Sequence, residues 1–329
     1  MSCERLGVIG AGAFGTALAQ LAAANGRETV LWGRDPAVVE SINRRNENTA
    51  YLPGLRLHSA LRATDRLDQL ADCDCWLMVT PAQAMRDVLA AAPGGERALI
   101  LCSKGIEAST GKFMSEVAAE LAPGSNLGVL SGPGFAEEIA AGLPAAVTFA
   151  SADRALYDAF RKRLSVPSFR LYHTGDLIGA QVGGAVKNVL AIGSGVVEGR
   201  RLGQSARAAL IARGFAEMTR FALAFGARRE TLAGLCGLGD LVLTCSSTSS
   251  RNFSLGVGLG EGRSAAELMA GSNSVVEGAF TAPVVARLAR ERGVDMPIVD
   301  AVEGLLAGRF NVDEVLDALL SRPPRPESH

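Results

Sequence analysis

The sequence predicts a two-part protein, in which an α/β part with a doubly wound, mostly parallel sheet is followed by an all-α part. Short, continuous apolar runs alternate with helical stretches through the first half. Continuous hydrophobicity is typical of strands that are covered on both faces, as in parallel sheets. From about Leu177 strand-like runs nearly vanish and long helical stretches follow. The length of 329 residues suits two domains.

The elements follow in order. The expected strands are Arg5–Ile9, Glu28–Trp32, Cys75–Val79, Ala98–Cys102, Leu127–Leu130 and Ala145–Phe149, and the first helices are Ala13–Asn25 and Pro36–Asn46. The expected later helices are Ile178–Glu198, Ser205–Phe225, Ala279–Arg292, Ile298–Ala307 and Val312–Leu320. We therefore divide the chain into a domain at 1–177, a helical domain at 178–320 and a polar, proline-rich, flexible tail at 321–329.

Composition excludes several classes of protein. The 33 basic and 34 acidic residues give a net charge of -1, which argues against nucleic-acid binding. Long apolar stretches at 6–26 and 178–197 are interrupted by glycines or polar side chains, so we expect neither a signal peptide nor a membrane span. Six scattered cysteines without a C-x-x-C pair predict reduced thiols and a cytoplasmic location. The three histidines are isolated, so we expect no metal.

A glycine-rich turn follows the first expected strand. Gly10-Ala-Gly12-Ala-Phe-Gly15 has the form G-x-G-x-x-G and opens the first expected helix. Gly10 permits the tight turn, Gly12 lets the backbone approach a pyrophosphate, and Gly15 lets the helix pack closely on the strand. The helix N-terminus adds free N–H groups and positive potential. In this context the motif predicts a Rossmann-type dinucleotide site.

The residue after the second expected strand bears on the choice of cofactor. That strand ends in Leu31-Trp32-Gly33-Arg34, where an acidic residue would hold the ribose hydroxyls of NAD. Arg34 can pair with a 2′-phosphate, which favours NADP(H). Asp35 is adjacent and could instead cap the next helix, so NAD(H) stays open.

Two lysines and one aspartate lie in apolar or glycine-rich parts of the sequence, where a charged side chain is expected to have a partner or a functional role. Lys104 follows a buried strand at the sheet edge that faces the ligand crevice in open α/β folds. Lys187 lies mid-helix among apolar or tiny neighbours, and desolvation there would lower its pKa toward neutrality. Asp240 lies in a glycine-rich apolar loop and needs a cationic partner, for which Lys187 would serve. The alternative for Lys187 is a side chain that snorkels to the surface.

A serine-rich loop after Asp240 ends in Ser250-Arg251-Asn252, ahead of a helical run from Phe253. Hydroxyls, a guanidinium and a helix N-terminus together predict a phosphate cradle. The alternative is a flexible serine loop with an ordinary helix cap.

Together these motifs resemble the bacterial-type NAD(P)-dependent glycerol-3-phosphate dehydrogenases over nearly the whole chain. The matching stretches are the glycine motif, Leu31-Trp-Gly-Arg34, Ser103-Lys-Gly105, Ser131-Gly-Pro-Gly-Phe135, Gly183-Gly-Ala-Val-Lys-Asn188, Gly237-Leu-Gly-Asp-Leu-Val-Leu-Thr244, Ser250-Arg-Asn252 and Val275-Val-Glu-Gly278.

The resemblance implies reduction of dihydroxyacetone phosphate to sn-glycerol 3-phosphate for phospholipid synthesis. It makes Lys187 the proton donor and, in reverse, acceptor, with Lys104 and Asp240 as the other catalytic residues. The implied substrate contacts are Lys104, Gly132, Gly134, Lys187, Asp240, Ser250, Arg251 and Asn252. The implied cofactor contacts are Gly10, Gly12, Ala13, Phe14, Gly15, Arg34, Lys104, Ala136, Arg251, Val275 and Glu277. The cofactor is NADP(H), NAD(H) or both.

The chain departs from the family pattern at two positions. Relatives often have serine at the position of Ala13 and a hydroxyl residue at that of Gly134. Two other functions stay open: a different two-domain dehydrogenase, acting on a 3-hydroxy acid or a sugar acid phosphate, and a non-catalytic NADPH-binding sensor. The long helices of the second domain could form a homodimer interface.

Overall fold

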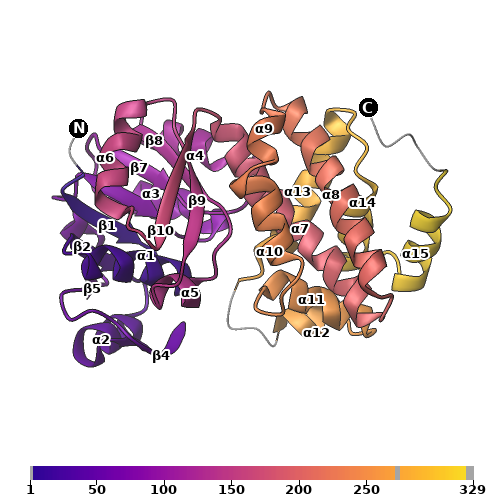
Figure 1. Cartoon of the computed structure of the whole chain (residues 1–329), viewed down its shortest axis with the longest axis horizontal. Coiled ribbons are helices and arrows are strands. Elements are labelled where there is room, and N and C mark those ends of the chain that lie inside the picture. Colours follow the sequence, from indigo (N-terminus) through magenta and orange to yellow (C-terminus); the bar gives the residue numbers. More distant parts are fainter. Residues whose placement is uncertain (1–2, 271–274, 324–329) are drawn as a thin grey trace.

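The computed structural model describes residues 3–270 and 275–323 and contains two layered parts (Figure 1). The first is an eight-stranded sheet with helices on both faces, and the second is a group of helices. The predicted fold class, a doubly wound and mostly parallel sheet followed by an all-α part, is therefore confirmed. Most of the predicted 321–329 tail, residues 324–329, lies outside the described residues.

The strands are ordered β10-β9-β8-β7-β6-β1-β2-β5. Their bounds are β1 Arg5–Ile9, β2 Glu28–Trp32, β5 Arg62–Thr64, β6 Cys75–Met78, β7 Ala98–Leu101, β8 Asn126–Ser131, β9 Ala145–Ala150 and β10 Phe169–Thr174. The six predicted strands all form. Neighbours pair in parallel except β8 and β9, which are antiparallel. The repeating strand pattern predicted no such reversal, because hydrophobicity carries no information on strand direction.

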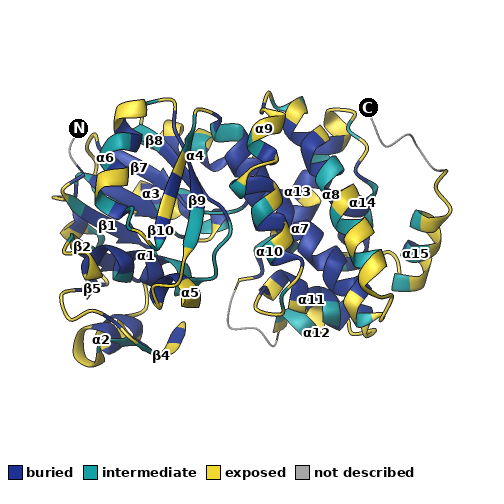
Figure 2. Ribbon diagram, in the orientation of Figure 1, coloured by how far each residue is buried: buried dark blue, intermediate teal, exposed yellow. Residues whose placement is uncertain are grey.

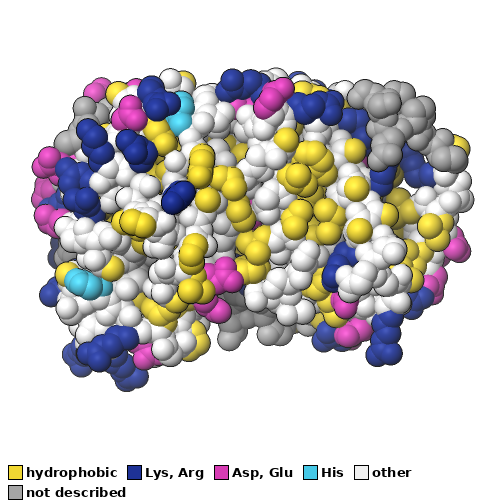
Figure 3. Space-filling model, in the orientation of Figure 1, with side chains coloured by type: hydrophobic (Ala, Val, Ile, Leu, Met, Phe, Trp, Pro, Cys, Tyr) yellow, Lys and Arg dark blue, Asp and Glu magenta, His cyan; other side chains and the backbone are white. Residues whose placement is uncertain are grey.

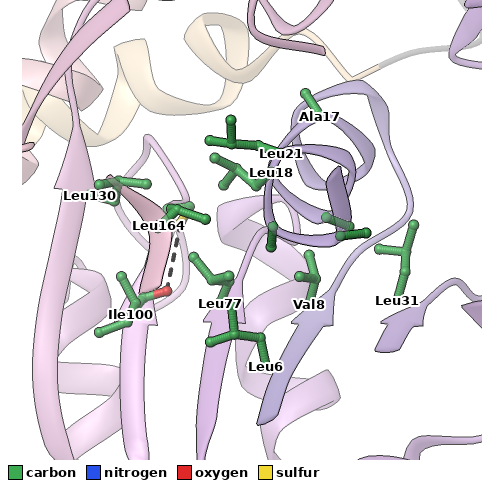
Figure 4. Close-up of a cluster of buried hydrophobic side chains, with 14 of the residues drawn as sticks. Leu6, Val8, Ala17, Leu18, Leu21, Leu31, Leu77, Ile100, Leu130 and Leu164 are labelled. Carbon is green, nitrogen blue, oxygen red and sulfur yellow. Dashed lines mark hydrogen bonds between the residues drawn. The ribbon is translucent and has the colours of Figure 1, made fainter. Parts of the chain in front are cut away.

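Both faces of the sheet are buried, as continuous hydrophobicity predicted. Leu6 and Val8 of β1 point to one face, where Leu18 and Leu21 of α1 cover them (Figure 4). Ile9 points to the other face. Helices α1 (Ala13–Ala24), α2 (Pro36–Arg45), α5 (Ala136–Ala140) and α6 (Arg154–Leu164) contribute to the first core, and α3 (Met85–Ala91) and α4 (Met114–Leu121) to the second.

The second part surrounds helix α7 (Leu177–Gly199), which is buried from Gly179 to Val197 (Figure 2). Around it stand α8 (Gln204–Ala224), α9 (Arg229–Leu232), α10 (Asp240–Thr244), α11 (Arg251–Gly260), α12 (Ala265–Ala270), α13 (Glu277–Glu291), α14 (Pro297–Leu306) and α15 (Val312–Leu320). Among the described residues, no helix is long and apolar enough to cross a membrane.

Helices α7 and α11 touch backbone to backbone through glycines. A Cβ on Gly195 would lie 2.0 Å from the Phe253 carbonyl oxygen, and one on Gly256 would lie 2.0 Å from that of Ile192. Gly199 and Gly260 meet in the same way one turn later. The chain contains 38 glycines, and some of them thus serve helix packing rather than ligand approach.

The connection between the two parts is short. Strand β10 ends at Thr174 and α7 starts at Leu177, with Asp176 between them as the helix cap. The Asp176 carboxylate accepts hydrogen bonds from the Gly179 and Arg228 backbone N–H groups, at 2.8 Å each. We propose that the domain division after residue 177 follows this junction.

Candidate active site

Asp240 lies between two lysines that come from different parts of the chain. Lys104 Nζ donates to Asp240 Oδ2 at 2.6 Å, and Lys187 Nζ donates to Asp240 Oδ1 at 2.8 Å. The Asp240 residue is 1% exposed and Lys187 is 8% exposed. The structure thus brings together the three predicted catalytic side chains, and Lys187 does not reach the surface.

Local structure explains how these side chains meet. Lys104 follows the carboxyl end of β7, and Lys187 lies near the middle of α7. A π-helical turn, Leu235–Gly239, leads into Asp240. That turn lies against α7 at Gly183, where a Cβ would be 2.3 Å from the Cys236 carbonyl oxygen. Because Gly183 precedes Lys187 by one helical turn, the close approach delivers Asp240 to the lysine.

Burial and pairing set the pKa values of the site. Burial lowers the pKa of Lys187 to about 8, against the opposing effect of the Asp240 carboxylate. Burial by itself raises the pKa of Asp240, but Lys104 and Lys187 outweigh it and hold that pKa below its ordinary value. Asp240 is therefore an anion near neutral pH, while Lys187 is close to its titration point.

Thr244 completes the group, although the sequence analysis gave it no role. Lys187 Nζ donates to Thr244 Oγ1 at 2.8 Å, and the Thr244 hydroxyl donates to Asp240 Oδ1 at 3.2 Å. The signal was present in the sequence: Asp240 and Thr244 are four residues apart, so they share one face of a helix.

Gly132 contacts the lysine group, and Gly134 follows it two residues later in the chain. Lys104 Nζ also donates to the Gly132 carbonyl oxygen at 3.0 Å. Gly132 has φ +154°, and a Cβ there would lie 2.9 Å from Val147 Cα. A Cβ on Gly134 would lie 2.8 Å from Ile139 Cδ1, so a hydroxyl residue at this position would require Ile139 to move.

Asn252 and Asn188 tie the site's helices together. Asn188 donates to the Lys104 carbonyl oxygen at 3.2 Å, and Asn252 donates to Asn188 Oδ1 at 3.0 Å. Gly278 N–H in turn donates to Asn252 Oδ1 at 2.9 Å. Asn252, predicted to bind substrate, is 8% exposed and uses its amide within the protein. Asn188 lay in a matching stretch but had been given no role.

The predicted phosphate cradle forms the start of α11. Ser250 caps this helix by accepting the Phe253 N–H at 3.2 Å and is 5% exposed, so its hydroxyl acts as an ordinary cap. Arg251 is exposed. An anion at this place can bind the guanidinium of Arg251 and the first N–H groups of the ten-residue helix α11.

The glycine motif has the geometry that a pyrophosphate needs. Gly10 has φ +122°, and a Cβ on Gly15 would lie 1.9 Å from the Gly10 carbonyl oxygen. A Cβ on Gly12, by contrast, would meet nothing within 4 Å. Protein atoms therefore occupy the space beside the first and third glycines, whereas the middle glycine faces free space, as the close approach of a pyrophosphate requires.

The other predicted cofactor residues lie around this motif or across from it. Phe14 lies in the motif beside Ala13, and its ring centroid is 5.9 Å from Lys104 Nζ. Arg34 is exposed after β2, while Asp35 caps α2 by accepting the Ala37 N–H at 2.9 Å. Ala136 opens α5.

Glu277, the first residue of α13, offers a buried acceptor atom. Its Oε1 accepts the Ala82 N–H at 3.2 Å, while its Oε2 is buried without a hydrogen-bond partner. A Cβ on Gly105 would lie 3.0 Å from that Oε2 atom, so the free acceptor faces the loop that carries Lys104. Burial raises the pKa of Glu277. Such an orphaned acceptor fits a ligand that brings a donor. Val275 is 39% exposed nearby in the chain.

No group of three or more potential metal ligands occurs among residues 3–270 and 275–323. All six cysteines are free and buried.

Comparisons with known proteins cover both parts. A family described as NAD-dependent glycerol-3-phosphate dehydrogenase matches with its N-terminal model over residues 5–157 and its C-terminal model over residues 176–317. A curated relative from Erythrobacter litoralis, named glycerol-3-phosphate dehydrogenase (NAD(P)+), is 56% identical over 322 residues, 98% of this chain and 97% of the relative. One of the same name from Caulobacter vibrioides is 53% identical and covers 100% of both chains.

Solved structures agree with the sequence comparisons. A glycerol-3-phosphate dehydrogenase crystal structure from Coxiella burnetii is 35% identical, with a TM-score of 0.93, and the match covers 97% of this chain and 99% of that one. The Saccharomyces cerevisiae enzyme is 27% identical, with a TM-score of 0.80 and coverage of 95% and 98%.

Proposed function

The chain belongs to the NAD-dependent glycerol-3-phosphate dehydrogenase family, and from this premise we propose that Lys187, Lys104 and Asp240 form its catalytic centre. The protein is an NAD(P)-dependent oxidoreductase that interconverts dihydroxyacetone phosphate and sn-glycerol 3-phosphate. We propose that it supplies glycerophospholipid synthesis. The observation that carries the proposal is the buried Asp240 carboxylate held between two lysines.

The proposed proton donor is Lys187. When bound, the nicotinamide cofactor supplies the hydride that the ketone carbon accepts. As negative charge develops on the ketone oxygen, Lys187 donates a proton to it, and in the reverse direction the neutral amine accepts that proton. A pKa of about 8 makes both forms accessible near neutral pH. A lysine with an ordinary pKa would be a poor base there.

Asp240 and Lys104 support this transfer electrostatically. Asp240 stays ionised between the lysines, so it orients Lys187 and keeps its cationic form stable in a buried place. Lys104, bound to the Gly132 carbonyl oxygen and to Asp240, provides fixed positive charge for the developing oxyanion. Thr244 limits the directions in which the Lys187 amine can point.

We propose that the substrate's phosphate binds at Arg251 and the start of α11. This places an anion at a helix N-terminus, next to a guanidinium. Ser250 contributes through the cap that it gives the helix, and Asn252 through its link to Asn188. Gly132 and Gly134 then bring backbone close to the small substrate.

We propose that the cofactor binds along the glycine motif, Ala13, Phe14, Arg34 and Ala136, and reaches Val275 and Glu277 on the helical side. The free space at Gly12 and the unpaired Oε2 atom of Glu277 support this course. Arg34, exposed at the end of β2, supports a preference for NADP(H) over NAD(H).

The other functions considered have weaker support. D-mandelate dehydrogenase shares only 13% identity at a TM-score of 0.66, which shows the fold alone. A non-catalytic sensor would not need two lysines around a buried aspartate. The discriminating experiment supplies NADPH with dihydroxyacetone phosphate, a 3-hydroxy acid or a sugar acid phosphate. Of the three substrates, we expect only dihydroxyacetone phosphate to cause NADPH oxidation. If folded protein does not turn over dihydroxyacetone phosphate, the proposed function is overturned.

We further propose a cytoplasmic homodimer. Six unpaired cysteines suit a reducing compartment such as the cytoplasm.

The proposed dimer is supported by the surface of the helical part. Hydrophobic side chains gather over the helical part of the face shown in Figure 3. Leu223 of α8 and Val242 of α10 are 42% and 47% exposed. Light scattering that gives the mass of one chain at micromolar concentration would contradict the dimer.

A further inference from the structure

The segment between α2 and β5 forms a small hairpin beside the glycine motif. Its strands are β3 (Glu47–Asn48) and β4 (Leu52–Arg56), joined by a tight turn. Asn48 has no exposed surface although its side chain is polar. A buried amide is costly unless hydrogen bonds satisfy it, so its partners show what it does there.

Asn48 uses three of its hydrogen-bonding positions. Its Nδ2 donates to the Ala11 carbonyl oxygen at 2.9 Å and to Thr16 Oγ1 at 2.8 Å. Its Oδ1 accepts the Tyr51 N–H at 3.2 Å, which fixes the amide from the hairpin's own turn. The side chain therefore links the hairpin to the residue between the first two glycines of the motif.

This contact also sets the direction of the next N–H group in the proposed cofactor site. The Ala11 carbonyl and the Gly12 N–H belong to one peptide unit, and in a trans peptide they point in opposite directions. Since Asn48 holds the carbonyl oxygen toward the interior, the Gly12 N–H points away from it. Gly12 is the N-cap residue of α1, and a Cβ on it would meet nothing within 4 Å, so free space for a ligand lies beside this peptide unit.

We propose that Asn48 is a positioning residue for the cofactor's pyrophosphate, because it fixes the Ala11–Gly12 peptide with its N–H directed at the bound anion. The inference rests on the proposed dinucleotide site. Thr16 Oγ1 also donates to the Ala11 carbonyl oxygen, but this hydrogen bond is long, at 3.4 Å. Thr16 Oγ1 is in addition held in place by the hydrogen bond from Asn48. Without Asn48 the peptide keeps one weak contact and can rotate.

The test replaces Asn48 by leucine, which has similar volume and no donor. The probes are NADPH and ADP-ribose, which contain the pyrophosphate, and adenosine 2′-monophosphate, which lacks it. Leucine removes all three hydrogen bonds of Asn48, and the freed peptide should then lose one hydrogen bond from the Gly12 N–H to the pyrophosphate. Binding of NADPH and ADP-ribose should therefore weaken about ten-fold in isothermal titration. Binding of adenosine 2′-monophosphate should change less than about two-fold, and kcat at saturating NADPH should stay within about three-fold.

The matched control is Asn43→Ala. Asn43 also makes two side-chain hydrogen bonds to backbone, with the Ala63 N–H and carbonyl at 2.9 Å each, but it links α2 to β5 away from the glycine motif. We expect a similar loss of thermal stability with unchanged affinity for ADP-ribose. If Asn48→Leu does not fold, Asn48→Ser removes the same donor with a smaller polar side chain.

Two outcomes would overturn the inference. One is a folded Asn48 variant that binds ADP-ribose as tightly as the wild type. The other is equal weakening of ADP-ribose and adenosine 2′-monophosphate, which would mean general damage to the site. A wild-type protein that binds no NADPH would instead overturn the proposed function, and the inference with it.

Discussion

Lys187 Nζ lies 2.8 Å from Asp240 Oδ1, inside the protein and 53 positions away in the chain. Both partners are buried, so the pair is not a surface ion pair of little consequence. The carboxylate stabilises the ammonium form of Lys187, while burial favours the amine. The balance of these two effects leaves the lysine able to give and take a proton near neutral pH.

Replacement of Asp240 by asparagine should shift the pH profile of glycerol 3-phosphate oxidation. Without the carboxylate, burial and the nearby charge of Lys104 both disfavour the ammonium form of Lys187, so its pKa falls further. The amine is then available at lower pH, so the acidic limb of the kcat profile moves to lower pH. Removal of one partner from a buried pair should also cost about 3–5 kcal/mol of stability. An unchanged acidic limb in the folded variant would contradict the pairing.

Thr244→Val should lower kcat more than it raises KM for the substrate. Valine keeps the shape but loses the hydroxyl that bonds Lys187 and Asp240, and a bond of about 1 kcal/mol is lost at the proton donor. We expect a decrease in kcat of about five-fold to ten-fold and recovery with Thr244→Ser. Thr219→Val is the control, because the Thr219 hydroxyl bonds only the Phe215 carbonyl oxygen within α8. Equal losses in both variants would exclude a specific role for Thr244.

Arg34→Ala should change the choice of cofactor. Loss of a guanidinium that pairs with the 2′-phosphate should raise KM for NADPH about ten-fold and leave KM for NADH within about two-fold. Arg44→Ala is the control, since Arg44 lies on α2 and pairs with Glu40. Steady-state kinetics with each cofactor measures the effect. If KM rises equally for both cofactors, Arg34 does not recognise the 2′-phosphate.

Glu217 should make the fold less stable as pH rises. This buried side chain of α8 accepts hydrogen bonds from the Ile298 and Val299 N–H groups at the start of α14. Burial raises its pKa from 4.5 to about 7, so the folded state binds the proton more tightly than the unfolded state. Its contribution is present below the unfolded pKa and is lost as pH rises to about 7.

Thermal unfolding of the wild type and of Glu217→Gln measures this effect. The Tm difference between the two should grow in favour of the variant as pH rises from 4.5 to about 7. A constant difference over that window would show that the Glu217 carboxyl titrates normally.

Local patterns in the sequence predicted much of the fold. Continuous apolar runs predicted the buried strands, such as Cys75–Met78, because both of their faces are covered. Strand β10 was missed, since its alternation of buried and exposed residues at the sheet edge lacks that signal. The contact between Gly195 and Gly256 was also missed, because glycines that bring two helices together look like any others in one sequence.

Sequence patterns predicted those site residues whose charge stands out against apolar neighbours. Lys187 and Asp240 each carry a charge in an apolar stretch, and the need of Asp240 for a cationic partner suggested Lys187. Thr244 carries no charge and is signalled only by its spacing of four residues from Asp240. Asn48 has no signal at all, because its role comes from contacts that only folding creates. The hydroxyl of Ser250 caps α11, and its contact with the substrate's phosphate stays a prediction.

The most direct test of the account is single-turnover oxidation of NADPH by dihydroxyacetone phosphate in the Lys187→Met variant, with Lys112→Met as the control on a half-buried lysine that pairs with Glu120. Loss of the proton donor should slow the chemical step at least about 100-fold, while titration gives an unchanged Kd for NADPH. Lys112→Met should react as the wild type does. A Lys187→Met variant that binds NADPH normally and turns over at a near-normal rate would contradict the assignment of Lys187 as the proton donor.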